Sequence, residues 1–443
     1  MKKILVMLST VLLLSACSGN GGSVPKGETE GDRKTVVISV MRKDRFLENA
    51  VQKFEEQHKN IHIEMKEYKV SEDTGGGGMS MESLSLADVE KYVQSVTTQV
   101  ISGKGADIIL MSELPQDKFV EKKLLVNLND LLSKDSSFDQ NTLYTNILKA
   151  SQDGDGLYAM PISFSLSLFQ GNTGLLKKAN ISVENNESWN WTQFKEVAQN
   201  LKEQGGSDKL INLHPTSLLF DFIEDNYAQL VGQGQPDFDS DSFRNMMAEI
   251  KSMYDEGLLS EGMSFDDDQA AFQMADIYSP EQALTMRQGL DYYQKPSASE
   301  KNYGAPFKPT YSLGINSKSG VQQEAWAFIR FLLSENMQAS PNLMGLPINK
   351  DVTSNKFNEI LQKIESGTLE TMIPQDMLPD GETVKKRIEV VEKQISEANF
   401  RRFSDMKVLM IAMEEFNTFM NGQKSAEEVS KLIQNRVKTY LNE

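Results

Sequence analysis

Residues 35–41, Thr35-Val-Val-Ile-Ser-Val-Met41, form a short apolar run rich in β-branched side chains, which predicts a buried strand. The segment from Phe46 to His58 follows, and its apolar side chains fall on one face of a helix. Ile61-His-Ile-Glu-Met65 then alternates as a second strand does. This order predicts a β-α-β unit with parallel strands, so the expected fold class is α/β.

The same alternation continues along the chain. We expect a helix over 86–102, ended by Gly103 and Gly105, and a buried strand over 107–111. Trp191 to Glu203 has helical periodicity, with Thr192 as the candidate N-cap. Later elements are a strand over 311–316, a helix over 324–334 and mostly helical structure over 356–443.

The composition excludes several classes of function. The 443 residues include 46 Lys and Arg against 63 Asp and Glu, a net charge of -17. Nucleic acid is not an expected partner, because clustered cations bind a phosphate backbone. The single Cys excludes intrachain disulfides and thiolate zinc sites, and we expect no metal ion and no cofactor.

The first residues indicate the compartment. Lys2 and Lys3 precede an apolar run from Ile4 to Leu14, which is shorter than the ~20 residues that span a bilayer. Residues 1–16 therefore have the pattern of a signal peptide. Leu14-Ser-Ala-Cys17 resembles the lipobox of bacterial lipoproteins, which implies lipid on Cys17. An ordinary secretory signal with a chance Cys is the alternative.

Residues 17–34 would then hold the lipidated Cys17 and a flexible tether rich in Gly, Ser, Glu and Lys. Such a tether suits a folded body that is held off a membrane. We expect an extracytoplasmic protein that is attached to the cell membrane by lipid alone.

Six segments share one order and spacing with a known family. They are residues 99–109, 119–128, 157–163, 191–194, 314–319 with 325–332, and 345–349. The first contains Gly103-Lys-Gly-Ala-Asp-Ile-Ile109, and the last is Gly345-Leu-Pro-Ile-Asn349. Together they resemble the extracellular solute-binding proteins of bacterial ABC importers, in the group that includes maltose-binding protein.

The resemblance implies a fold of the type II periplasmic-binding-protein kind, with two discontinuous α/β lobes, a hinge and a ligand cleft between the lobes. On that basis the N-terminal lobe takes residues 35–163 and 308–348, and the C-terminal lobe takes 164–307 and 349–443. The family partner is a pair of membrane permease subunits, and we expect a monomer. The chain has no G-x-x-x-x-G-K-[ST], G-x-S-x-G or H-E-x-x-H motif, and we expect no enzymatic activity.

Candidate ligand-binding residues follow the predicted strands, because ligands in open α/β sheets bind beyond the carboxyl ends of strands. Arg42, Lys43 and Asp44 follow the first strand, and Ser112 and Glu113 follow the strand over 107–111. A solvated turn is the alternative for both groups. Ser163 and Phe164 lie at the crossing between lobes that the resemblance implies.

Aromatic side chains are the second group, because a sugar needs flat apolar surfaces beside polar groups. With only three Trp in the chain, Tyr292, Tyr293 and Tyr311 are the candidates, and core packing is the alternative. Adjacent tyrosines also ligate ferric ion in related families, which leaves iron as a weaker alternative.

One acidic stretch is similar to a calcium loop. Asp237-Phe-Asp239-Ser-Asp241 has the alternating acids, but Ser242 and Ala248 occupy the positions that need Gly and Glu. We interpret it as a polar loop that caps the helix over 242–255.

The sequence therefore predicts a lipid-anchored binding protein that captures a small solute, expected to be a carbohydrate, and delivers it to an ABC permease. The alternatives are a protein of the same fold that binds a peptide, polyamine or metal, and a partner that presents its ligand to a membrane sensor.

Overall fold

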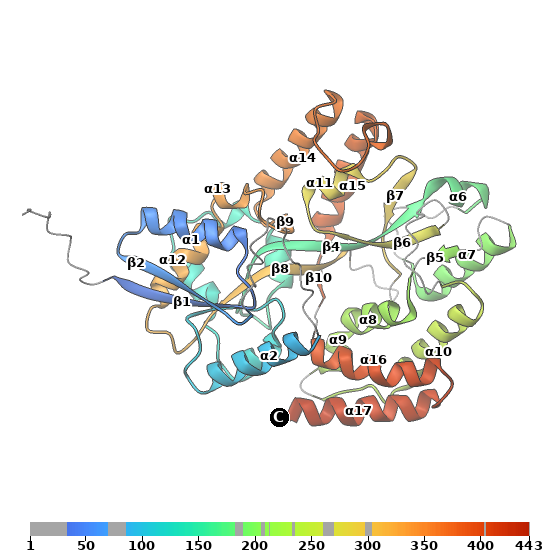
Figure 1. The fold of residues 1–443 in the computed structure, drawn as a ribbon, viewed down its shortest axis with the longest axis horizontal. Coiled ribbons are helices and arrows are strands. Elements are labelled where there is room, and N and C mark those ends of the chain that lie inside the picture. The colour runs from blue at the N-terminus through green and yellow to red at the C-terminus, as the bar shows by residue number, and fades with distance from the viewer. Residues whose placement is uncertain are drawn as a thin grey trace, which may run out of the picture.

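The β-α-β unit forms as predicted in the computed structural model (Figure 1). β1 (Lys34–Val40) and β2 (Ile61–Glu67) are parallel, with Val36 opposite Ile63. α1 (Arg45–Gln57) connects them and buries Phe46 and Phe54 in the same core as these two strand residues. The α/β fold class is confirmed.

The structure describes residues 33–69, 86–181, 189–204, 209–211, 213–232, 235–259, 270–296, 304–402 and 405–442. The signal peptide, Cys17, nearly all of the tether and the Gly75–Gly78 stretch lie outside the described residues. Within the described ranges, every helix is too short or too polar to cross a membrane.

A single sheet runs through the molecule, with the strand order β2-β1-β3-β8-β4-β6-β5. β10 pairs with β8, and β7 and β9 pair with β4. The bounds of the remaining strands are β3 (Ile108–Leu110), β4 (Met160–Asn172), β5 (Lys209–Ile211), β6 (Ala270–Ile277), β7 (Leu290–Tyr293), β8 (Pro306–Ile315), β9 (Leu346–Pro347) and β10 (Phe400–Arg401). β4 and β8 cross the middle of the molecule and connect its two halves (Figure 1).

Helices surround both halves of this sheet (Figure 1). In the half that contains β1 they are α2 (Leu86–Ile101), α3 (Gln116–Glu121), α4 (Leu128–Lys134), α5 (Thr145–Ala150), α12 (Gln322–Leu332) and α13 (Glu335–Gln338). Towards β5 they are α6 (Thr173–Lys178), α7 (Trp191–Glu203), α8 (Pro215–Asp225), α9 (Tyr227–Leu230) and α10 (Asp241–Asp255). The others are α11 (Pro280–Thr285), α14 (Lys350–Glu365), α15 (Gly381–Glu397), α16 (Met406–Met420) and α17 (Ala426–Asn442).

The structure has two large apolar cores, and they meet along β4. Leu168 belongs to the core that contains β1, whereas its neighbour Phe169 belongs to the core of α7, α8, α10, α16 and α17. Phe357 of α14 and Val391 of α15 pack in the first core. The lobe limits given above stay a prediction, because packing does not show which elements move together.

Helix caps confirm one sequence interpretation and correct another. Ser240 caps α10 through a hydrogen bond from the Phe243 N–H, as expected for the acidic loop before it. The cap of α7 is Asn190 and not Thr192. The Oδ1 atom of Asn190 accepts from the Gln193 N–H at 2.9 Å, and Gln193 reaches back to the Asn190 N–H at 2.8 Å, which completes a capping box.

Candidate functional site

Charged side chains converge where β3, β8 and β10 meet in the middle of the molecule. A small pocket of about 30 Å³ lies there, between Ser112 after β3, Lys308 on β8, and Arg401 and Arg402 at β10. We call it the central pocket. The other residues that line it are Met111, Leu114, Gln116, Pro309 and Ser312.

Arg402 binds several carboxylates of α8. Its Nη2 atom lies 2.6 Å from Asp221 Oδ1 and 2.6 Å from Glu224 Oε2, and its Nε atom lies 2.9 Å from Asp225 Oδ1. Its Nη1 atom donates to Ser167 Oγ of β4 at 2.9 Å. Burial alone would lower the pKa of Arg402, but these carboxylates raise it, so the guanidinium stays charged.

Lys295 is the second buried cation of this cluster. Its ammonium group pairs with Asp221 and lies 3.9 Å from Asp225 Oδ2. Burial opposes the charge of Asp221, but the two cations lower the pKa of that carboxyl overall. Burial raises the pKa of Asp225 to about 6, although the same two cations oppose the shift.

Glu113 follows β3, and Lys308 on β8 lines the central pocket. Burial raises the pKa of Glu113, the positive charge of Lys308 lowers it, and the negative charge of Glu224 raises it. Neither the Glu113 carboxylate nor the Lys308 ammonium group forms a hydrogen bond or ion pair with the described part of the chain, although the Lys308 carbonyl accepts from Ser165. An acceptor and a donor therefore remain available beside each other.

Tyr278 presents an aromatic ring at the same place. It follows β6, and 45% of its surface is exposed. Its hydroxyl donates to Asp276 Oδ2 at 3.3 Å, and Ser167 donates to the other oxygen of Asp276. Burial and the charge of Asp276 raise the pKa of Tyr278 to about 12. Arg402 lowers this pKa and Glu224 raises it. The ring thus lies close to the carboxylates around Arg402.

Of the predicted site residues, Ser112 and Glu113 lie at this junction. The Ser112 hydroxyl donates to the Thr310 carbonyl at 2.8 Å. Sequence reasoning missed Lys308, Arg402 and Tyr278. Only Tyr278 had a usable signal, an aromatic residue directly after a strand.

The residues after β1 form a separate group. Asp44 caps α1 by accepting from the Leu47 N–H at 2.9 Å, and it also accepts a hydrogen bond from the Tyr311 hydroxyl. Burial raises the pKa of Tyr311, and Asp44 adds to the shift. Arg42 is half-buried, whereas Lys43 is exposed and its N–H donates to Glu67.

The remaining predicted ligand-binding residues are buried in the interior. The Ser163 hydroxyl donates to the Met344 carbonyl at 2.6 Å, and the Phe164 ring packs edge-on against Phe307. The Tyr292 hydroxyl donates to the Gln282 carbonyl at 3.2 Å. Tyr293 belongs to the other core, with its ring 5.8 Å from that of Phe272.

The two halves also touch beyond the central pocket. Lys407 of α16 pairs with Glu90 of α2. Lys118 of α3 donates to the Tyr440 carbonyl of α17 at 3.2 Å. The Lys118 ammonium also lies 3.8 Å from the centre of the Tyr440 ring. We call these two contacts the outer ties. A groove of about 530 Å³ runs between α2 and the two C-terminal helices at this point.

Several solved structures share this fold over nearly their whole length. An ABC substrate-binding protein from Listeria monocytogenes, in complex with cycloalternan, is 17% identical with a TM-score of 0.56, and the match covers 93% of this chain and 100% of that one. Maltose-bound MalE3 of T. maritima is 15% identical with a TM-score of 0.55, over 92% and 99%. The sugar-binding protein MalE of Xanthomonas citri is 14% identical with a TM-score of 0.61, over 92% and 98%.

Identities this low support the fold alone. The family follows from the sequence, because residues 39–339 match the model of the bacterial extracellular solute-binding proteins. Members of that family bind solutes outside the cytoplasm and are not enzymes, in agreement with the prediction that this chain catalyses no reaction. The match spans more than half of the chain, so this chain belongs to the bacterial extracellular solute-binding proteins.

Proposed function

We propose that this protein captures a carbohydrate between its two halves and delivers it to the permease of an ABC importer. The observation that carries the proposal is the pair of charged groups on Glu113 and Lys308, whose carboxylate and ammonium lack hydrogen-bond partners among the described residues. A sugar hydroxyl donates one hydrogen bond and accepts others, so one hydroxyl can bridge a carboxylate and an ammonium group.

Tyr278 supports the same ligand class. A sugar ring has apolar C–H faces that pack on aromatic rings, and Tyr278, which contacts Asp276 and lies close to Arg402 and Glu224, has 45% of its surface exposed. The structures from Listeria monocytogenes and T. maritima were solved with cycloalternan and maltose, which are both carbohydrates. In this proposal Ser112 and Glu113 are retained as ligand-binding residues, and Lys308 and Tyr278 are added.

The sequence supports the remaining parts of the proposal. Lobe closure about β4 and β8 would bring α8 and Tyr278 toward Glu113 and present a closed surface to the permease. Cys17 would carry the lipid, with residues 17–34 as the tether and the protein as a monomer. The lobe limits are those given above, with residues 35–163 and 308–348 in the N-terminal lobe.

A cationic solute such as a polyamine is the second candidate. The acids at the junction outnumber the cations by five to four, with Glu113, Asp221, Glu224, Asp225 and Asp276 against Lys295, Lys308, Arg401 and Arg402. An excess of buried carboxylates favours a positively charged ligand.

Thermal melting of residues 18–443 tests both candidates against one panel of monosaccharides, oligosaccharides, polyamines, peptides and ferric ion. A ligand at 100 times its dissociation constant adds ~2.7 kcal/mol to the free energy of unfolding. We expect a higher melting temperature with one class of sugar. A shift with polyamines alone would reject the carbohydrate and keep the binding function, and a flat panel would contradict both.

A further inference from the structure

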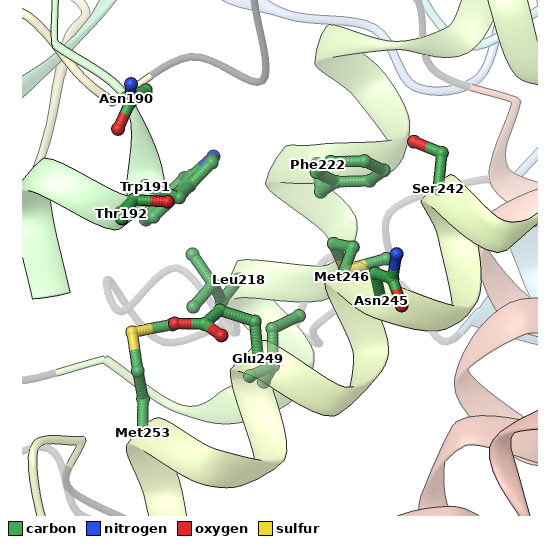
Figure 2. Close-up of a pocket in the computed structure, with 11 residues that line it drawn as sticks. Asn190, Trp191, Thr192, Leu218, Phe222, Ser242, Asn245, Met246, Glu249 and Met253 are labelled. Carbon is green, nitrogen blue, oxygen red and sulfur yellow. The ribbon is translucent and has the colours of Figure 1, made fainter.

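A second pocket lies between α7, α8 and α10, apart from the central pocket (Figure 2). Its volume is about 420 Å³, which is within the ~300–1,000 Å³ range of small-molecule sites. Its lining shares no residue with the central pocket. α8 contributes Leu218 and Phe222 to it, whereas Asp221 and Glu224 of the same helix bind Arg402.

One wall of this pocket is aromatic. Trp191, at the first turn of α7, faces Phe222 and Met246 across the opening, and Leu218 lies below them (Figure 2). Trp191 is the half-buried member of the three tryptophans. Trp189 and Trp326 are buried, with their indole N–H groups bonded to Gln294 and Asp135. The Trp191 ring is therefore the tryptophan surface that a ligand can reach.

Uncharged polar groups surround the aromatic wall. The side chains of Ser242 and Asn245 and the indole N–H of Trp191 form no hydrogen bond with the described part of the chain. Asn190 uses its Oδ1 atom to cap α7, which leaves its amide N–H groups as donors. The rim thus offers donors and acceptors without a formal charge.

The charge of the pocket is already balanced. Among the described residues that line it, Glu249 is the only charged one, and its Oε1 atom lies 3.4 Å from the Lys195 ammonium. A charged ligand would find no free counter-ion here. A purely apolar ligand would remove water from the amides of Asn190 and Asn245 and the hydroxyl of Ser242 without replacing their hydrogen bonds. An uncharged ring with one apolar face and several hydroxyls satisfies both conditions.

We propose that this pocket is a second saccharide-binding site, in which a sugar ring stacks on Trp191 and bonds to Asn245, Ser242 and Asn190. The site is separate from the central pocket and does not depend on the function proposed above. It would hold a further sugar, or a distant part of a long one.

The three tryptophans give a direct readout in protein with ¹⁵N-labelled indole groups. Each gives one N–H resonance, and the Trp191 resonance is identified by its loss in Trp191→Phe. Maltotriose and cellotriose are titrated at millimolar concentration, with hexylamine and glutamate as charged controls. We expect the Trp191 resonance to move with a trisaccharide and to stay in place with both controls, while the other two resonances do not move.

Two variants separate this site from the central pocket. Asn245→Ala should weaken the Trp191 response about fivefold, since it removes one neutral hydrogen bond at an exposed helix position that favours Ala. Tyr278→Ala, beside Asp276 and outside this second pocket, should leave the Trp191 response unchanged. Melting of each variant confirms that it is folded. The proposal would be overturned if the Trp191 resonance did not move with either sugar, or if it moved with hexylamine instead. It would also be overturned if the sugars moved this resonance as far in Asn245→Ala as in the wild type.

Discussion

The guanidinium of Arg402 binds three carboxylates of one helix, and this connects α8 to a residue that lines the central pocket. The same group reaches Ser167 on the long strand β4. Arg402 thus connects a crossing strand, a helix and the end of β10. Losing this side chain would leave several buried carboxylates with Lys295 as their remaining close cation.

Replacing Arg402 with Met tests this role. Removing one partner of a buried ion pair costs ~3–5 kcal/mol, because the remaining charge is uncompensated. We expect Arg402→Met to lower the free energy of unfolding in urea by about that amount. Lys385→Met is the control, since Lys385 and its partner Glu365 are both exposed, and it should cost ~0–1 kcal/mol. Equal effects of the two substitutions would contradict the role assigned to Arg402.

Asp225 makes the stability depend on pH. Burial raises the pKa of this carboxyl to about 6 from its ordinary 3.8. Between these values the folded chain keeps a proton that the unfolded chain has lost, so this contribution is largest at low pH and falls as the pH rises through 6. Asp225→Asn removes the dependence. Relative to the wild type, the free energy of unfolding of the variant should increase by roughly 2–3 kcal/mol between acidic and neutral pH.

Urea unfolding of both proteins, on either side of this pH window, measures the difference. Subtracting the wild type from the variant gives the effect of the Asp225 carboxyl together with its coupling to Asp221 and Glu224. A difference that is constant with pH, or that falls as the pH rises, would show that Asp225 is ionised in the folded protein like an ordinary carboxylate.

Residues differ in how well the sequence could place them. Glu113 was predictable, because it follows a buried strand of three residues that has a clear apolar pattern. Lys308 and Arg402 were not, since their position depends on β8 and β10 pairing across about ninety residues of chain. The sequence also could not show that Tyr292 and Tyr293 are buried, because a pair of tyrosines in a binding site has the same sequence as a pair in a core.

At the scale of elements, the short loops between strands and helices depend on a few glycines. Gly304 has a φ of +66°, and a Cβ there would collide with the carbonyl oxygen of Glu397 at the end of α15. This close approach holds the start of β8 beside α15 and β10. Gly367, after α14, has the same φ of +66° but open space around it.

This pair allows a matched test of the close approach. Gly367→Ala should cost ~1–2 kcal/mol, the strain of an L-residue in a left-handed conformation. Gly304→Ala adds a steric overlap with backbone and should cost ~1–3 kcal/mol more. Urea unfolding of both variants gives the comparison. Equal losses would mean that the chain around Gly304 shifts freely, and that β8 is not fixed by α15.

Helices and strands were easier to predict from the sequence than the positions of single side chains. The helices over α1, α2, α7, α10 and α12 and the strands β1, β2 and β3 match their sequence patterns closely, because each has a strong apolar period. The cap of α7 was misassigned by two residues, since Asn190 and Thr192 are both good caps and only Asn190 has Gln193 three positions later. Strands of two residues, such as β9 and β10, carry too few side chains to produce a period.

At the scale of the whole molecule, the outer ties connect elements that the lobe limits assign to different lobes. Both are charge-assisted contacts, and the side chains of Lys407 and Glu90 are about one third exposed. Partial exposure screens such a pair, so each tie contributes little by itself. Together they bias the two halves toward contact.

The double substitution of Lys118 and Lys407 with Ala tests this bias. We expect a larger radius of gyration in X-ray scattering and a solute affinity about two- to fivefold weaker, because closure then costs more free energy. Raising the salt concentration should reduce the difference from the wild type. Lys385→Ala, on the outer surface, is the control and should change neither quantity. Unchanged scattering and affinity in the double variant would show that the ties play no part in closure.

Calorimetric titration is the most direct test of carbohydrate binding at Glu113, Lys308 and Tyr278. The sugar that raises the melting temperature is titrated into the wild type, Tyr278→Ala and Glu113→Gln. We expect one sugar per chain in the wild type and an affinity about tenfold or more weaker in each variant, where tenfold is ~1.4 kcal/mol. Wild-type affinity in both variants would contradict the account and place the ligand elsewhere.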